Sequence, residues 1–356
     1  MAAAVPIEIT VKSLSESGLK SIPSCFASKN LQDLEVIDPQ EGTIPIIDFP
    51  LLTSSDPQHM SKIIQDLGRA CEDGDSSCTN VVEFQLINHG IPESLMKNIM
   101  DGLKGFFDLS NEEKTEFQGN HVMDHITRSV FNADSKKVHC CRDFLKCFVH
   151  SEFHFPNKPA GLRDTAFEYT GETREVTMEL LKGVSESLGL EPNYFSKALD
   201  LDSGLGRFIA NLYPPCPQPE LTMGIHPHTD PGLLTILIEN GISGLQILHN
   251  GKWFRVYAPP NALMVNIADQ LEVVTNGKYK GAIHRATLYG KAMATRMSLA
   301  IAYGPCPDKV IRPASEFVNE SHPPAYTALT CGEYYELHLA NAYSKITALD
   351  YVRIQN

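Results

Sequence analysis

The second half of the chain changes its hydrophobic pattern near Gly206, from helical spacing to the alternation that is typical of strands. Asn250-Gly251 within it is the strongest two-residue signal for a β-hairpin. Short strand-like runs at roughly 8–12-residue spacing are typical of a sandwich, jelly roll or barrel. These runs, each bounded by turn residues, read RFIANLYPP, LLTILIEN, GLQILHNGKWFRV, NALMVNIAD, AIHRATL and RMSLAIAYG. We therefore expect a β jelly roll, a double-stranded β-helix, as the core.

The first half reads as mostly helical, with short strands in GTIPIIDFPLL and VVEFQLINHG. Apolar residues recur at helical spacing in MSKIIQDLGRACED and PESLMKNIMDGLKGFFDL, and Ser110-x-x-Glu113 is a capping box. The clearest helix is expected to start after Gly171 and to end at Gly189. The resulting α+β fold has four expected parts: an irregular arm (1–43), a mostly helical region (44–200), the jelly-roll core (201–310) and a helical segment covering the pocket (311–356).

Composition excludes several classes of function. The net charge of -13, without a Lys/Arg-rich run, argues against binding to nucleic acid or to an anionic membrane. No apolar run approaches the roughly 18 residues that a membrane span needs, and the first residues lack a secretory signal pattern. Nine cysteines without a C-x-x-C pair are typical of reduced thiols. We expect a cytoplasmic protein, a monomer, that acts on a small molecule.

Two histidines and an aspartate, His226, His228 and Asp230, alternate in GIHPHTDPGLLTIL. If the run is one strand, the three side chains share a face, and the apolar continuation LLTILI turns that face toward the interior. A buried carboxylate beside imidazoles requires compensation, which a divalent cation provides. An H-x-D pair alone has a high risk of chance occurrence, and a simple His–Asp hydrogen bond explains it equally well. A third candidate ligand, His284 in GAIHRATL, favours a two-histidine, one-carboxylate metal site.

Two further pairs at i, i+2 spacing accompany these residues. Arg296 and Ser298 lie two apart in ATRMSLAIAY, and a buried guanidinium is suited to bidentate binding of a carboxylate. Asn211 and Tyr213 lie two apart in ANLYPPCPQP, although core packing also accounts for the tyrosine. The spacing alone leaves open whether these side chains meet at one site.

The motifs N-x-Y-P-P-C-P-x-P, H-T-D, D-x5-T-N-G-K-Y-K-x3-H-R and R-x-S, in this order, resemble the plant 2-oxoglutarate- and Fe(II)-dependent dioxygenases of specialised metabolism. That group includes flavonol synthase, hyoscyamine 6-hydroxylase and the gibberellin oxidases, and the similarity extends over about residues 44–310. The resemblance implies that His228, Asp230 and His284 bind Fe(II). It also implies that 2-oxoglutarate is bound by Arg296, Ser298 and Tyr213, with Asn211 nearby.

An activity follows from the same resemblance. Fe(II), 2-oxoglutarate and O2 would hydroxylate, desaturate or demethylate a small, mainly apolar plant metabolite, releasing succinate and CO2, with ascorbate in support. The residues expected to contact that substrate are Phe131, Phe144, Phe148, His226, Tyr335 and Leu339. Spacing alone does not exclude His226 as a metal ligand.

The chain departs from the family pattern at two places. Relatives usually read Trp-Gly-Phe-Phe-Gln before the first core strand, whereas this chain has a longer polar insertion at residues 74–82, before EFQ. His139-Cys140-Cys141 replaces more hydrophobic residues near the substrate entrance, which suggests altered specificity.

Alternative functions remain open from sequence. One is a relative of the aminocyclopropane-carboxylate oxidase type that uses no 2-oxoglutarate, and another is an inactive ligand-binding homologue. A zinc hydrolase would need a general base beside the metal, and no glutamate is placed for it.

Overall fold

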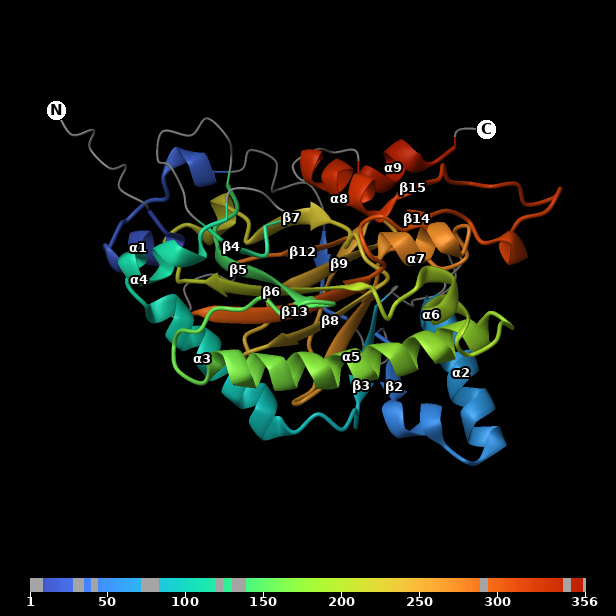
Figure 1. The fold of residues 1–356 in the computed structure, drawn as a ribbon. Coiled ribbons are helices and arrows are strands. Elements are labelled where there is room, and N and C mark those ends of the chain that lie inside the picture. Colours follow the sequence, from blue (N-terminus) through green and yellow to red (C-terminus); the bar gives the residue numbers. More distant parts are fainter. Residues whose placement is uncertain are drawn as a thin grey trace.

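Two β-sheets face each other at the centre of the molecule (Figure 1). The structure is a computed structural model, which describes residues 9–27, 35–39, 44–71, 83–119, 124–129, 139–288, 294–341 and 347–354. The eight-stranded sheet has the order β2 (Ile46–Asp48), β3 (Glu83–Ile87), β11 (Leu263–Ile267), β8 (Leu234–Glu239), β13 (Arg296–Gly304), β6 (Leu205–Tyr213), β5 (Asp143–His150) and β4 (Ile126–Arg128). The five-stranded sheet has the order β1 (Val36–Ile37), β10 (Lys252–Arg255), β9 (Leu245–His249), β12 (His284–Ala286) and β7 (Ile225–His228). A small third sheet pairs β14 (Val310–Ile311) with β15 (Leu329–Thr330).

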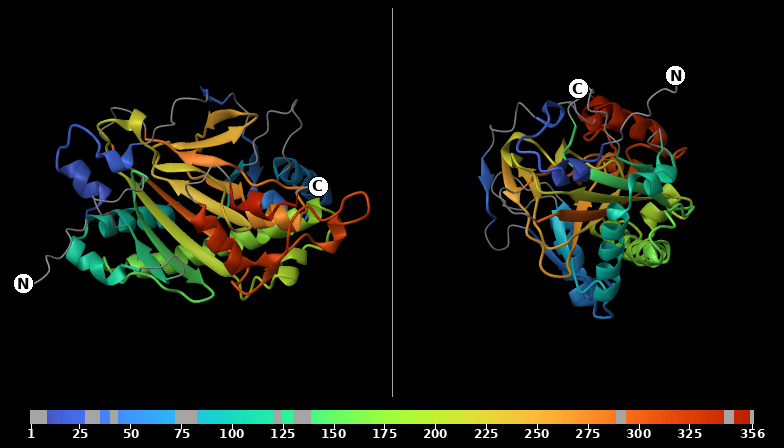
Figure 2. Two further views of the ribbon diagram at one scale, coloured as in Figure 1. Left: turned by 90° about the horizontal axis from the view of Figure 1, so that it is seen from above. Right: turned by 90° about the vertical axis from the view of Figure 1, so that its left-hand side faces the viewer.

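Helices cover the outer face of the eight-stranded sheet, while α8 and α9 lie on the opposite side of the molecule (Figures 1 and 2). The long helix α5 (Leu162–Ser187) packs against β8 and β13 and against its neighbours α2 (Pro57–Cys71) and α3 (Glu93–Asp108). The remaining helices are α1 (Val11–Glu16), α4 (Asn111–Lys114), α6 (Tyr194–Leu199), α7 (Asp269–Val274), α8 (Cys331–Ala340) and α9 (Ala348–Val352). In the part of the chain that the structure describes, no helix is long and apolar enough to cross a membrane.

Apolar and polar side chains alternate along the central strands, so the two faces of the eight-stranded sheet differ in polarity. On β13, Met297, Leu299 and Ile301 belong to the large apolar core that the helices complete. The intervening residues face the other sheet, because successive side chains of a strand point to opposite faces; these are Arg296, Ser298, Ala300 and Ala302. Strand β6 follows the same rule: Arg207, Asn211 and Tyr213 line the space between the sheets, whereas Phe208, Ala210 and Leu212 belong to the apolar core.

The α+β architecture with a jelly-roll core is as the sequence predicts. The hairpin of β9 and β10 turns at Asn250 and Gly251, whose positive φ angles of 48° and 74° match the Asn-Gly signal. The Ser110–Glu113 capping box forms at the start of α4. The segment 311–356, which was expected to be helical, contains α8 and α9.

The expected start of the longest helix is wrong. α5 begins at Leu162 and runs through Gly171, which is exposed and has nothing within 4 Å of an added Cβ. An interior glycine lowers helix stability by roughly 0.5–1 kcal/mol, which tertiary packing of the rest of the helix overcomes.

The N-terminal arm, residues 1–43, was expected to be irregular, but part of it forms regular structure. It contains α1, and β1 pairs in parallel with β10. The Asp143 carboxylate accepts hydrogen bonds from the backbone N–H groups of Val11 and Lys12 at 2.9 and 2.8 Å. A side chain distant in sequence therefore supplies the partners of this helix start, which no local pattern reveals.

Candidate metal centre and pocket

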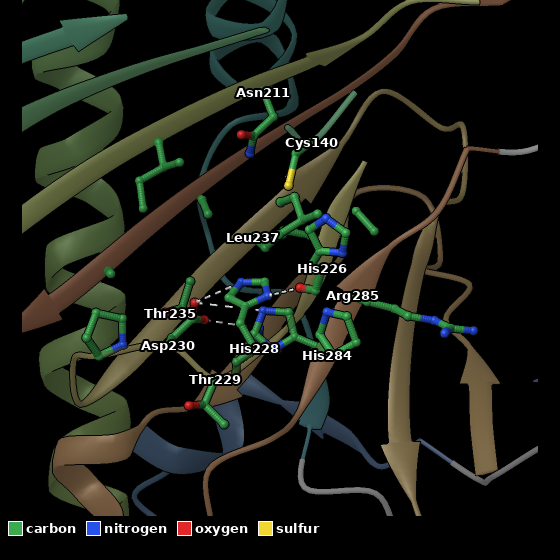
Figure 3. A pocket seen from close by; sticks show the side chains of 18 of the residues that line it. Cys140, Asn211, His226, His228, Thr229, Asp230, Thr235, Leu237, His284 and Arg285 are labelled. Atoms are coloured by element: carbon green, nitrogen blue, oxygen red, sulfur yellow. Dashed lines mark hydrogen bonds and ion pairs between the residues drawn. The ribbon is translucent and has the colours of Figure 1, made fainter. Parts of the chain in front are cut away.

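The three predicted metal ligands converge between the two sheets (Figure 3). His228, Asp230 and His284 each present a ligand atom, and these atoms all lie within 4.8 Å of one another. Nε2 of His228 is 3.9 Å and Nε2 of His284 is 3.7 Å from Oδ1 of Asp230. The two histidines are direct partners in the antiparallel pair of β7 and β12, so their rings meet at 4.3 Å between centroids.

One part of the sequence argument is wrong in its details. β7 ends at His228, so Asp230 approaches from the following loop and not from the same strand. LLTILI does not continue β7 but forms β8 in the opposite sheet. The ligands converge because the chain crosses between the sheets here. His226 lines the pocket, but it is outside the cluster of candidate ligands.

Backbone carbonyls fix the orientation of both histidine rings. Nδ1 of His228 lies 2.9 Å from the carbonyl oxygen of His226, and Nδ1 of His284 lies 2.9 Å from that of Ala282. A carbonyl oxygen can only accept, so each Nδ1 carries the hydrogen and each Nε2 keeps a lone pair directed toward Asp230. This is the outer-shell arrangement that prepares histidines to bind a metal.

The charge state of the cluster also suits a cation. Burial, together with the neighbouring His284, lowers the pKa of His228 to about 3. Burial alone would raise the pKa of Asp230, but the two imidazoles outweigh it, so the carboxyl pKa is lowered. Metal ligands must be deprotonated imidazoles and carboxylates, so no proton has to leave His228 or Asp230 at neutral pH.

The donor set therefore fits Fe(II). Two imidazole nitrogens and one carboxylate are the two-histidine, one-carboxylate arrangement that leaves further coordination positions open. Nδ2 of Asn266 donates to Oδ2 of Asp230 at 3.4 Å, which holds the carboxylate from the opposite sheet.

A second set of predicted residues meets across β6 and β13. Tyr213 is the direct cross-strand partner of Arg296, and Asn211 is the partner of Ser298. The guanidinium carbon of Arg296 lies 4.6 Å from the centre of the Tyr213 ring, and Nδ2 of Asn211 lies 3.4 Å from the Ser298 hydroxyl. The two sequence pairs with i, i+2 spacing thus form one polar patch.

The Arg296 guanidinium is buried and only partly satisfied by the chain. One nitrogen forms an ion pair with Glu239 on β8, whereas Nε and Nη1 have no hydrogen-bond partner among the described residues. Burial would lower the pKa of Arg296, but Glu239 and Tyr213 raise it above its usual value. Buried donors without partners are rare, so the patch fits the distal carboxylate of a dicarboxylic acid such as 2-oxoglutarate.

The pocket between the sheets has a volume of about 190 Å³, far more than one water molecule occupies. Of the residues expected to contact substrate, His226, Tyr335 and Leu339 line this pocket. Phe144 and Phe148 do not line it, but their rings contact cations that do: Arg142 and Lys146 lie near Phe144, and Arg207 lies near Phe148. Phe131 and the insertion at 74–82 lie outside the described residues.

The segment His139-Cys140-Cys141 differs from the family pattern. Of these residues, Cys140 lines the pocket (Figure 3), and Cys141 packs against α1 and Phe26.

Sequence reasoning missed several polar side chains that line the pocket. These include Arg142, directly before β5, Lys146 on β5 and Arg207 on β6. β5 itself was not predicted, although the alternation in RDFLKCFVH is a usable signal. His338 on α8 approaches the metal cluster from the side: its Nε2 lies 2.8 Å from the carbonyl oxygen of Thr229.

Glu83, the first residue of EFQ and of β3, puts a carboxyl group into the inner face of the sheet. Glu83 is completely buried, opposite Asn266, and neither carboxyl oxygen has a hydrogen-bond partner among the described residues. Burial raises the pKa of Glu83 well above its usual value, and Glu239 and Asp230 add to the effect. The raised pKa favours the neutral form of the carboxyl group, which an unpartnered buried site tolerates better than the charged form.

Comparison with protein families gives two matches. The profile of the 2OG-Fe(II) oxygenase superfamily matches residues 205–305, and that of the N-terminal region of non-haem dioxygenases in morphine synthesis matches residues 44–165. Among curated proteins, 2-oxoglutarate-dependent dioxygenase 19 of Oryza sativa subsp. japonica is 41% identical over 89% of this chain and 92% of its own length. Deacetoxyvindoline 4-hydroxylase of Catharanthus roseus is 30% identical over 97% of this chain and 86% of its own.

A solved structure has the same fold. The crystal structure of JOX2 in complex with 2OG, Fe and JA superimposes with a TM-score of 0.79 at 28% identity, covering 92% of each chain. The resemblance read from the ordered motifs is thereby confirmed. The chain belongs to the plant 2OG-Fe(II) dioxygenases, and it is an oxidoreductase whose cofactor and co-substrate are Fe(II) and 2-oxoglutarate.

Proposed function

We propose that this protein oxidises a C–H bond of a small organic molecule held in the pocket between the sheets, as an enzyme of plant specialised metabolism. His228, Asp230 and His284 would hold Fe(II), and Arg296, Ser298 and Tyr213 would hold 2-oxoglutarate. The observation that carries the proposal is the convergence of the three ligand atoms within 4.8 Å, beside a guanidinium with unsatisfied donors.

Bound Fe(II) and 2-oxoglutarate supply the oxidising chemistry, in which the keto acid is converted to succinate and CO2 with O2 as oxidant. The chain positions the reactants. Asn266 holds the Asp230 carboxylate, the carbonyl groups of His226 and Ala282 fix the imidazoles, and α8 covers the pocket with Tyr335 and Leu339. Apolar side chains around the ligands exclude water and orient the substrate; they include Ile209, Ile225, Leu237, Leu245, Ala286 and Ala300.

The outcome we propose is hydroxylation, with desaturation or demethylation as variants of the same step. Two relatives support oxidation of plant metabolites: one is named as a 4-hydroxylase of deacetoxyvindoline and one as a flavonoid 7-O-demethylase. The described cysteines, eight in all, are free thiols, which supports a reducing compartment such as the cytoplasm. A monomer remains our expectation.

The test is a screen of plant metabolites with Fe(II), 2-oxoglutarate and ascorbate, read by mass spectrometry. A gain of one oxygen identifies hydroxylation, a loss of two hydrogens identifies desaturation, and a loss of a methylene identifies demethylation. Succinate must form together with the product. Product formation without 2-oxoglutarate would instead support the aminocyclopropane-carboxylate oxidase type of reaction.

A further inference from the structure

One wall of the pocket carries basic side chains that are neither metal ligands nor among the residues assigned to the 2-oxoglutarate carboxylate. They are Lys146 on β5, Arg142 directly before β5, and Arg207 on β6. Asp230, already placed at the metal centre, is the single carboxylate among the described residues that line the pocket. The lining therefore has far more cationic than anionic groups.

No described carboxylate neutralises Arg142 or Lys146. The ammonium group of Lys146 lies 4.7 Å from the centre of the Phe144 ring. The guanidinium carbon of Arg142 lies 5.5 Å from the centre of the same ring, and Arg142 donates to the side-chain oxygen of Asn211. Neither forms an ion pair with a described carboxylate, although desolvated charges normally require one.

The electrostatic environment of these basic side chains favours the binding of an anion. Burial lowers the pKa of Lys146 well below its usual value, and the nearby Arg207 and Arg142 lower it further. A bound negative charge in this corner would relieve the mutual repulsion of the cations.

Apolar groups connect this corner with the metal side of the pocket. Lys146 is the cross-strand partner of Ile209, which pairs in turn with Ala300, and Ala300 pairs with Leu237. Ile209, Ala300 and Leu237 all line the pocket, so an apolar row leads away from the ammonium group across the sheet. A ligand that fits both features has an anionic end and an apolar body.

We propose that the substrate is a carboxylic acid whose carboxylate binds Arg142 and Lys146, while its apolar body lies along Ile209, Ala300 and Leu237 toward the metal centre. This inference rests on the proposed function and specifies its substrate class. The acid group and the oxidised carbon would lie at opposite ends of the molecule.

The experiment compares acids with their neutral methyl esters. Binding of cinnamate, 4-phenylbutanoate and decanoate, and of each methyl ester, is measured by isothermal calorimetry on the full-length protein loaded with Mn(II) and 2-oxoglutarate. We expect at least one acid to bind at least ten times more tightly than its ester. The variants Lys146→Gln and Arg142→Gln should each remove most of that preference.

Two control variants match the substitutions outside the pocket. Lys278 lies 5.5 Å from the Phe317 ring and Arg163 lies 5.3 Å from the Phe153 ring, so Lys278→Gln and Arg163→Gln remove comparable stacked cations. Both should keep the acid preference. Esters that bind as tightly as the acids in all three pairs, or an unchanged preference in both pocket variants, would overturn the proposal, as would an absence of binding by every acid.

A second readout separates this proposal from the one on which it rests. Binding of 2-oxoglutarate to the Mn(II)-loaded protein should be unchanged within about twofold in Lys146→Gln, because Lys146 does not contact the Arg296 patch. If the wild-type protein binds 2-oxoglutarate normally but does not prefer acids over esters, only the proposed binding site for the substrate carboxylate is contradicted. A wild-type protein that fails to bind 2-oxoglutarate contradicts the proposed function itself.

Discussion

Glu239 and Arg296 form a buried ion pair across β8 and β13, on the inner face of the sheet where 2-oxoglutarate is expected to bind. Both side chains are nearly inaccessible, and two guanidinium nitrogens of Arg296 remain without a partner in the described structure. The chain therefore supplies one carboxylate to Arg296 and leaves room for a second. The two carboxylates would repel each other, so Glu239 should set the affinity for the keto acid.

Glu239→Gln tests this balance. Without 2-oxoglutarate the buried Arg296 loses its counter-charge, and the free energy of unfolding should fall by on the order of 3 kcal/mol. Adding 2-oxoglutarate should restore more stability than in the wild type, because the repulsion is gone, and the KM for 2-oxoglutarate should fall. Thermal unfolding with and without the keto acid measures both effects. The exposed Glu152→Gln is the matched control; identical ligand-induced shifts in the two variants would contradict the prediction.

Asp230→Ala should remove tight metal binding and lower turnover by more than about 100-fold, since even outer-shell changes cost 10–100-fold. The two imidazoles would remain without the negative charge that balances the cation. Co(II) or Mn(II) binding followed by calorimetry measures this directly, and circular dichroism checks that the fold is intact. Asp202→Ala, at a highly exposed side chain, is the control. Full activity of Asp230→Ala would show that the ligand assignment is wrong.

Gly244→Ala should displace Arg296. A Cβ at Gly244 would lie 2.5 Å from Nε and 2.6 Å from Cδ of Arg296, closer than real contacts allow. The guanidinium must then shift, so the KM for 2-oxoglutarate should rise by about tenfold or more while the metal affinity stays the same. Gly171→Ala, on the exposed face of α5, meets nothing within 4 Å and should raise stability by up to about 1 kcal/mol. An equal KM for 2-oxoglutarate in the two variants would contradict the close approach of Gly244 to Arg296.

The sequence predicts much of this site because strand alternation and ordered motifs are local signals. His228, Asp230, His284, Arg296 and Tyr213 were all identified in this way, and the structure brings them to one pocket. The contacts that could not be predicted from the sequence depend on which strands pair and in which register. The pairing of Glu239 with Arg296, and the position of Lys146 opposite Ile209, follow from which strands are neighbours, and that order is not encoded in any single segment.

Helix boundaries and loops account for most of the errors. Gly171 looks like a helix start but lies inside α5, where packing decides the outcome. Asp230 looks like a continuation of its strand but belongs to a loop, because the chain crosses there from one sheet to the other. Both errors arise from the same cause: tertiary packing overrides a local preference.

Asp269 should make the metal-free protein less stable as the pH rises from about 4 to about 8. Burial raises the pKa of this carboxyl to about 8, although the hydroxyl groups of Tyr334 and Thr229 donate to it at 2.6 and 2.8 Å. In the unfolded chain the group loses its proton near the usual pKa of 3.8, so within this range the folded state binds more protons. Its contribution therefore lowers stability by up to about 1.4 kcal/mol per pH unit and becomes constant above pH 8. Asp269→Asn cannot titrate, and its unfolding free energy should fall less over this range than that of the wild type. Urea denaturation at several pH values in the presence of EDTA measures the difference, and parallel curves for the two proteins would show that Asp269 is ionised in the folded state at neutral pH.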